Sequence, residues 1–120
     1  NGAAVRLFDA SDELAVCEGI ETALAVYLAT RKPVWAAISA GNLEKLWIPA
    51  SVSRVFVYAD NDADGDHAGQ YFAFALARRL AREPSAMGPR HIRVFLPRHA
   101  GTDWADVWQQ RLPSRVPCPR

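Results

Sequence analysis

Cysteine is scarce in this sequence, and its scarcity excludes two classes of protein. The 120 residues include two cysteines, Cys17 and Cys118. Cys17 ends an apolar run and is predicted to be a small buried residue, whereas Cys118 lies in a proline-rich tail. This pair forms neither a disulfide framework nor a zinc-ligand pattern, which fits a reducing compartment. We therefore expect a cytoplasmic protein.

Long apolar runs are also missing. No stretch approaches the ~20 consecutive apolar residues that a membrane-spanning helix needs, and no signal peptide is visible, so we expect no membrane partner. The composition, with 50% hydrophobic and 22% charged residues, is that of an ordinary globular protein. We predict a single domain over residues 1–120, with a core at about 14–110 and an irregular tail at 113–120. The first residue is Asn1 rather than Met, and we expect a fragment of a longer protein.

A large excess of charge of one sign is absent as well. The formal net charge is +1, which neither requires nor excludes a nucleic-acid partner. The distribution of charge is more informative than the sum. Four aspartates gather between residues 60 and 66, and a region rich in arginine follows them from residue 78 to residue 98.

What the sequence does contain is an alternation of short apolar runs and amphipathic patterns. Strands are predicted at residues 14–17, 34–38, 55–58 and 92–96, and helices at 21–30, 43–47, 67–82 and after Thr102. Residues 40–42 are predicted to form a turn, and Arg78, Arg79 and Arg82 to face water. Trp104 and Trp108 are predicted to pack the last helix onto the sheet. This order predicts an α/β fold with an open sheet of about four mainly parallel strands flanked by helices.

The acidic residues follow the predicted strands closely. Glu18 comes directly after the first strand, Asp60 and Asp62 after the third, and Asp103 and Asp106 after the fourth. Because the carboxyl ends of parallel strands meet at one edge of an open sheet, these side chains are expected to share that edge. Mg²⁺ prefers hard oxygen ligands and would neutralise such a cluster. Glu18 then serves either as a general base or as a metal ligand, and sequence alone does not choose between these roles.

Helix capping is the simpler explanation for part of the acidic segment. Asp64 and Asp66 stand at the start of the long predicted helix, where a carboxylate stabilises the helix dipole without any metal. We favour that role for these two residues and a functional role for Asp60 and Asp62, which end an apolar strand. His67 is expected to lie at the surface or to cap the helix, with metal ligation as the alternative.

Two other acidic motifs fit less well. Asp60, Asp62 and Asp64 match the first three ligand positions of an EF-hand calcium loop, but its twelfth position falls on Tyr71 instead of Glu. A phosphatase-type nucleophile at Asp60 is the other alternative. The last lysine of the chain is Lys45, so no later lysine assists that chemistry.

Four segments together resemble the Toprim domain family. Residues 16–23 (VCEGIETA) resemble its Glu-Gly motif, and residues 58–65 (YADNDADG) resemble its Asp-x-Asp motif. Residues 101–106 (GTDWAD) are similar to a third acidic element of the primase branch. Residues 39–43 (SAGNL) resemble a linker that is typical of phage and plasmid primases. Any one motif is weak, but the ordered set spans residues 14–108.

The resemblance implies a Toprim-like fold and a division of roles at the acidic edge. It implies Glu18 as the acid/base and Asp60 with Asp62 as ligands of Mg²⁺, for which Mn²⁺ would substitute. Asp103 and Asp106 are candidates for a second metal, and Arg98 for a phosphate contact.

One position departs from the pattern of many bacterial primases. Four residues after the motif glutamate they carry aspartate, whereas this chain has Thr22, with Glu21 beside it. We interpret Glu21 as a residue of the helix N-terminus rather than a catalytic group.

The function that these features favour is phosphoryl transfer on nucleic acid. We expect the catalytic domain of a nucleotidyltransferase, a DNA primase of a phage, plasmid or other mobile element. It would make RNA primers from nucleoside triphosphates on a single-stranded DNA template, with a helicase domain or subunit as a further expected partner. Little primer synthesis is expected from this chain alone. A metal-dependent Toprim nuclease and a non-catalytic binding module are the alternatives.

Overall fold

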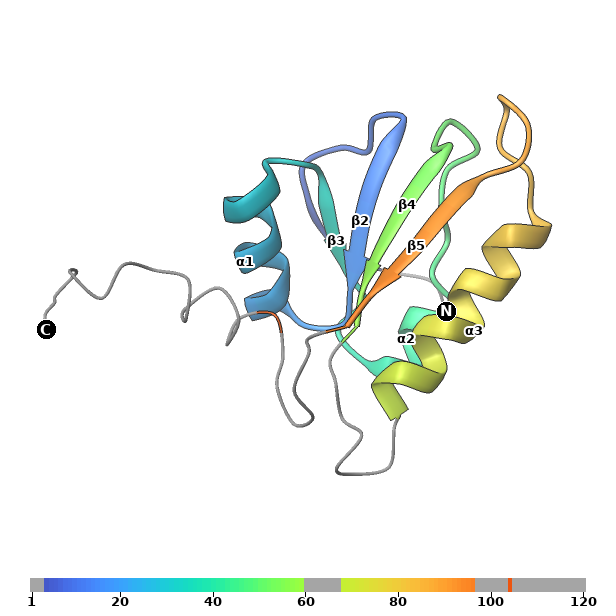
Figure 1. Ribbon diagram of the computed structural model, residues 1–120. Helices are drawn as coiled ribbons and strands as arrows, with labels where there is room; N and C mark the ends of the chain where they lie inside the picture. Colours follow the sequence, from blue (N-terminus) through green and yellow to red (C-terminus); the bar gives the residue numbers. More distant parts are fainter. Residues whose placement is uncertain (1–3, 60–67, 97–103, 105–120) are drawn as a thin grey trace, which may run out of the picture.

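A five-stranded sheet forms the centre of the part of the chain that the structure describes (Figure 1). The structure is a computed structural model, and it describes residues 4–59, 68–96 and Trp104. In sheet order, β1-β3-β2-β4-β5, the strands are β1 (Val5–Leu7), β3 (Val34–Ala36), β2 (Glu13–Cys17), β4 (Arg54–Tyr58) and β5 (His91–Phe95).

The sheet is mostly parallel, as the sequence predicts. β2 pairs in parallel with β3 and β4, and β5 pairs in parallel with β4. β1 runs antiparallel to β3 at one edge. The α/β prediction is therefore confirmed, with one strand more than expected. β1 was missed because it has three residues, two of them exposed, and so carries no apolar run.

In the described part of the chain, three helices cover the two faces of this sheet. They are α1 (Ile20–Thr30), α2 (Ala40–Glu44) and α3 (Ala68–Arg82). Figure 1 shows α1 on one face and α2 with α3 on the other. Within the residues described, no helix has both the length and the apolar character that crossing a membrane requires.

The core is divided by the sheet into two clusters. Successive side chains of a strand point to opposite faces. In β2, Leu14 and Val16 pack on the α3 side, whereas Ala15 and Cys17 pack on the α1 side. All four are fully buried, which confirms the buried position predicted for Cys17. A strand that is buried on both faces needs a continuous apolar run, and residues 14–17 supply one.

Two boundaries after β3 differ from the predictions. The strand ends at Ala36 instead of residue 38, and Ile38 adopts a φ of 78°, which lies outside the β region. Residues 40–42 belong to α2 and do not form the predicted turn. The helix begins early because the Ser39 hydroxyl accepts a hydrogen bond from the amide of Asn42, at 3.2 Å.

Arg79 does not face water as predicted. Its guanidinium donates hydrogen bonds to the carbonyl oxygen of Glu44, at 3.2 Å, and to that of Leu46. These contacts tie α3 to the end of α2. Arg78 and Arg82 are exposed, as expected.

The amino ends of the strands carry a network of paired charges. Arg54 forms ion pairs with Asp12 at 2.9 Å and with Glu13 at 2.7 Å, and Lys32 lies 3.4 Å from Glu13. Arg90, directly before β5, has a side chain that is 2% exposed. Its guanidinium donates to backbone carbonyls of residues 48, 49, 52 and 83 at 3.0–3.3 Å. These contacts fasten the loops at this end to the sheet.

Candidate active site at the carboxyl edge of the sheet

The carboxyl ends of three adjacent strands lie at one edge of the sheet. Cys17 is aligned with Tyr58, and Tyr58 with Phe95, so β2, β4 and β5 end at the same level. Their arrowheads point to the same edge in Figure 1. Glu18 follows β2 directly, as the sequence predicts, and Ala59 follows β4. The edge at which open α/β sheets bind ligands is therefore formed here by residues next to Glu18 and Ala59.

The backbone around Glu18 is held by hydrogen bonds from the neighbouring strand. The amide of Ala37 donates to the carbonyl oxygen of Cys17 at 2.9 Å, and the amide of Ile38 donates to that of Glu18 at 2.5 Å. Glu18 is half-buried and is followed by Gly19, which is the N-cap of α1. The carboxylate therefore projects from a short, fixed link between β2 and α1.

The segment after β3, which hydrogen-bonds to the backbone of Glu18, contains a strained residue and is held in place by two side chains. A positive φ is unusual for a β-branched residue, and Ile38 has a φ of 78°. The Asn42 side chain donates to the carbonyl oxygen of Ala37 at 3.3 Å, and Ser39 caps α2. Strained backbone conformations persist where the surroundings over-determine them, and they cluster at functional sites. The SAGNL segment thus has a local role, since its Ser and Asn fix the turn that holds Glu18.

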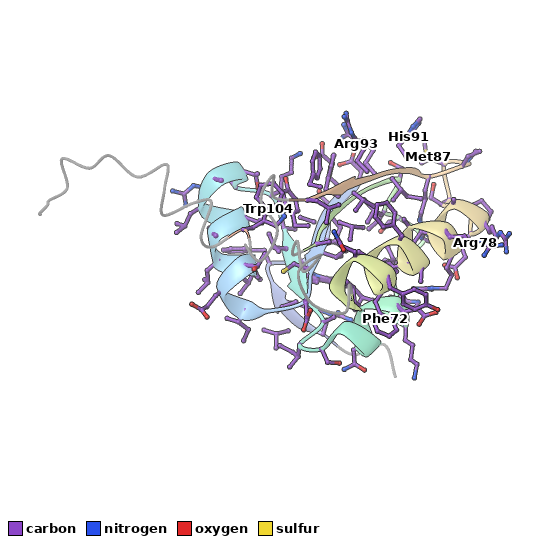
Figure 2. The ribbon with its side chains drawn as sticks, turned by 60° about the horizontal axis from the view of Figure 1, so that its bottom comes forward. Phe72, Arg78, Met87, His91, Arg93 and Trp104 are labelled. Atoms are coloured by element: carbon purple, nitrogen blue, oxygen red, sulfur yellow. The ribbon has the colours of Figure 1, made fainter. Side chains whose placement is uncertain are left out.

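Trp104 connects the ends of β4 and β5. Its indole N–H donates to the carbonyl oxygen of Ala59 at 3.0 Å and lies 3.3 Å from that of Phe95. Its ring meets the ring of Tyr58 edge-on, with 5.4 Å between centroids. Figure 2 shows Trp104 against the sheet. Trp104 was predicted to pack onto the sheet, and this contact is confirmed. Trp108, given the same role, lies outside the described residues.

Tyr58 supplies an uncharged aromatic surface beside this edge. Its ring lies 5.0 Å from that of Phe95 and 5.4 Å from that of Trp104. Burial raises the pKa of the Tyr58 hydroxyl above its ordinary value of 10.0, so the group stays protonated near neutral pH. Tyr58 therefore adds no negative charge to the edge.

The other predicted site residues fall outside what the structure describes. These are the candidate metal ligands and the candidate phosphate contact: Asp60, Asp62, Asp103, Asp106 and Arg98. Asp64, Asp66 and His67 also fall outside it. In residues 4–59, 68–96 and 104, no three His, Cys, Asp or Glu side chains form a metal-binding group. The metal site therefore stays a prediction.

Glu18 and Glu21 occupy different environments. Glu18 is half-buried at the carboxyl edge, whereas Glu21 is exposed in the first turn of α1, as predicted for a residue of the helix N-terminus. The Glu18 carboxylate is a hard oxygen donor of the kind that Mg²⁺ prefers. Among the described acidic residues, Glu18 thus fits the implied metal by its chemistry and by its place.

Sequence reasoning missed three residues that shape this edge. Ser39 and Asn42 stand three residues apart, and this spacing was the available signal for a capped turn. Nothing in the sequence indicates a positive φ at Ile38. Trp104 was expected to contact the sheet, but its hydrogen bond to Ala59 joins residues 45 positions apart and has no local signal.

Comparison with known proteins agrees with this geometry. The model of the Toprim domain family matches residues 13–114. The chain belongs to the Toprim domain family. This family contains nucleic-acid-processing enzymes, and the matched range includes Glu18, Ala59 and Trp104. No curated protein matches the chain.

A solved structure shares the Toprim fold. The chain is similar to a structure described as a DNA primase domain from Pseudomonas aeruginosa, with a TM-score of 0.57 and 18% sequence identity. The match covers 83% of this chain and 30% of that one, so the chain spans less than a third of its structural relative. At this identity, the similarity concerns the fold.

Proposed function

We propose that this chain is the catalytic Toprim domain of a DNA primase that joins ribonucleotides on a single-stranded DNA template. The observation that carries the proposal is the position of Glu18 on a braced link at the carboxyl edge of the sheet. Ala59, the residue that precedes the Asp60-x-Asp62 motif, directly follows the adjacent strand β4 at the same edge. Family membership and the fold of the primase relative support the same reading.

In the proposed reaction, the 3′-hydroxyl of the growing primer attacks the α-phosphate of a nucleoside triphosphate. A bond forms between the 3′-oxygen and the α-phosphorus, the bond to the β-phosphate breaks, and pyrophosphate leaves. Glu18 accepts the proton of the hydroxyl as general base. Asp60 and Asp62 would hold Mg²⁺, with Asp103 and Asp106 at a second position and Arg98 at a phosphate. Bound Mg²⁺ would supply electrostatic stabilisation of the charge that develops on the phosphate oxygens.

The wider setting is part of the same proposal. The SAGNL segment and the GTDWAD segment, which resemble those of phage and plasmid primases, favour a mobile-element origin. Single-stranded template and nucleoside triphosphates are the proposed partners, and a helicase domain or subunit is a further one. The chain is proposed to form one domain of a longer primase, because a complete primase needs template- and nucleotide-binding surfaces in addition to those that one 120-residue domain supplies.

The experiment compares two glutamates in the full-length protein that contains this chain. Glu18→Gln removes the proposed base and should lower primer synthesis at least 100-fold, which is the lower end of the range for general acid–base catalysis. Glu21→Gln removes an exposed carboxylate three residues away, from the first turn of α1. It should keep synthesis within about twofold of the unsubstituted protein, because no proton transfer depends on it. Incorporation of labelled ribonucleotides on a single-stranded template measures both.

Two outcomes would contradict the proposal. Equal activity of Glu18→Gln and Glu21→Gln would remove Glu18 from the chemistry. Metal-dependent nicking of plasmid DNA without primer synthesis would identify a nuclease with the same fold, since the same carboxylates can activate water in place of a hydroxyl.

A further inference from the structure

An open groove lies between α2 and α3, on the opposite side of the sheet from α1. Its volume is about 660 Å³, and its lining comes mainly from the outer face of α3. Figure 1 shows α3 starting near the carboxyl edge of the sheet and running away from it. The Tyr71 end of the groove is therefore the end that is nearer to the carboxyl edge.

The face of α3 that lines the groove combines aromatic rings with arginines. Tyr71, Phe74, Arg78 and Arg82 follow one another at spacings of three or four residues, so they share one side of the helix. α3 buries Ala73, Leu76 and Leu80 against the core on its other side. The four groove residues are thus not needed to hold the helix on the sheet.

These groove side chains are accessible to a ligand. Tyr71 is 62% exposed and Phe74 is 52% exposed. Figure 2 shows Arg78 projecting from α3 away from the sheet. From Tyr71 to Arg82 the helix rises about 16 Å, which is long enough to follow several nucleotides of a strand.

The charge of the groove favours an anionic ligand. Three arginines and two glutamates line it. Glu83 is paired with Arg79 at 3.1 Å and, from outside the groove, with Arg90 at 3.4 Å. Arg79 is already bound to the backbone of α2, which leaves the exposed Arg78 and Arg82 as the available cations.

We propose that this groove binds single-stranded nucleic acid, with Arg78 and Arg82 on phosphates and Tyr71 and Phe74 stacked on bases. Proteins that hold single strands without sequence preference combine cationic side chains with aromatic stacking platforms, and this helix face carries both. The choice of ligand rests on the proposed function, because primer synthesis requires a single-stranded template. The bound nucleic acid would extend from the carboxyl edge of the sheet along α3.

The test is binding of a fluorescent twelve-nucleotide oligothymidylate to the chain, followed by fluorescence anisotropy in the presence of EDTA. Arg78→Ala combined with Arg82→Ala should weaken binding roughly tenfold and lower the salt dependence, the slope of log K against log salt, by about 1.4. Tyr71→Ala should also weaken binding roughly tenfold, whereas Tyr71→Phe keeps the stacking ring and should bind as the unsubstituted chain does.

Arg93→Ala is the matched control. Arg93 is an exposed arginine on β5 that lies 5.7 Å from the Phe95 ring, outside the groove. It should leave binding unchanged within twofold. An absence of oligothymidylate binding, an equal loss in Arg93→Ala, or groove variants that bind normally would overturn the proposal. A change of oligomeric state in Tyr71→Ala without a change in DNA binding would overturn it as well, in favour of a protein partner.

Failure of this inference can be separated from failure of the proposed function. Binding in EDTA does not depend on a metal, so Glu18→Gln should retain it. If the groove variants bind DNA normally and Glu18→Gln loses primer synthesis, only the proposed role of the groove is rejected. Groove-dependent binding together with full synthesis in Glu18→Gln would reject the catalytic role of Glu18 alone.

Discussion

The two ends of this sheet differ in how their charged side chains are arranged. At the amino end, Arg54 lies between Asp12 and Glu13, and Lys32 reaches Glu13, so positive and negative groups alternate. At the carboxyl end, the sequence places acidic residues after successive strands. The described contacts there join backbone carbonyls to the N–H groups of Ile38 and Trp104.

This difference suggests that one end of the sheet contributes mainly to stability and that the other end is available for function. Alternating charges at the amino end satisfy one another and need no ligand. Carboxylates that share an edge repel one another, and such an arrangement lowers stability unless a cation binds. Such a group of carboxylates is expected where the protein uses a bound cation for its function. The amino end therefore acts as the structural end, and we propose the carboxyl end as the reactive one.

The largest expected effect comes from breaking the structural end at Arg90. Arg90→Ala removes the buried guanidinium that serves four backbone carbonyls. We expect the free energy of unfolding to fall by about 3 kcal/mol, because buried acceptors are left without donors. Urea unfolding measures the change. Arg54→Ala, which breaks exposed ion pairs, should cost less than about 1 kcal/mol. Equal losses in the two variants would contradict the structural role of Arg90.

A smaller effect is expected at the reactive end, from Trp104. Trp104→Phe keeps an aromatic ring beside Tyr58 but removes the donor to the carbonyl oxygen of Ala59. Unfolding should become easier by about 1 kcal/mol. The affinity for Mn²⁺ should fall as well, because Trp104 fixes the end of β4 next to Asp60.

The matched control for Trp104 is Trp47→Phe. Trp47 is 56% exposed and stacks on Trp35 with 6.5 Å between ring centroids. This variant should leave Mn²⁺ affinity unchanged. Paramagnetic relaxation of water protons measures the affinity of both variants, and an equal loss in both would show that Trp104 has no particular role at this edge.

The smallest effect is a gain in stability at Ile38. Its φ of 78° costs about 1–2 kcal/mol for a residue with a Cβ. Ile38→Gly relieves this cost, and glycine's greater freedom in the unfolded chain offsets part of the gain. A net stabilisation of about 0.5–1 kcal/mol is expected. Ile38→Val keeps the β-branch and should bring no gain. If both variants destabilise the fold equally in urea, the strain assigned to Ile38 is wrong.

The parts of the fold that could be predicted are those with a local pattern. β2 and β4 are short apolar runs, and α3 repeats its apolar residues at helical spacing. β1 has too few residues for such a pattern. α2 begins at residues that usually form turns, and the cap from Ser39 overrides that tendency.

The parts of the candidate site that could be predicted are those that follow directly from the end of a strand. The position of Glu18 at the carboxyl end of β2 follows from the sequence, since a buried run stops directly before it. The brace at Ile38 and the indole of Trp104 depend on contacts between distant segments. The sequence did not indicate that Arg90 is buried, because its partners are backbone carbonyls, and every residue type carries a backbone carbonyl.

The most direct test of the reactive edge is a titration of the chain with Mn²⁺, followed by NMR. Paramagnetic broadening should appear together at the amides of Glu18 and Ala59 and at the indole N–H of Trp104, and excess Mg²⁺ should reverse it. This result would mean that three segments distant in sequence share one metal site. Broadening confined to residues 60–66, with a sharp Glu18 amide, would indicate a local cation loop and would contradict a catalytic edge built around Glu18.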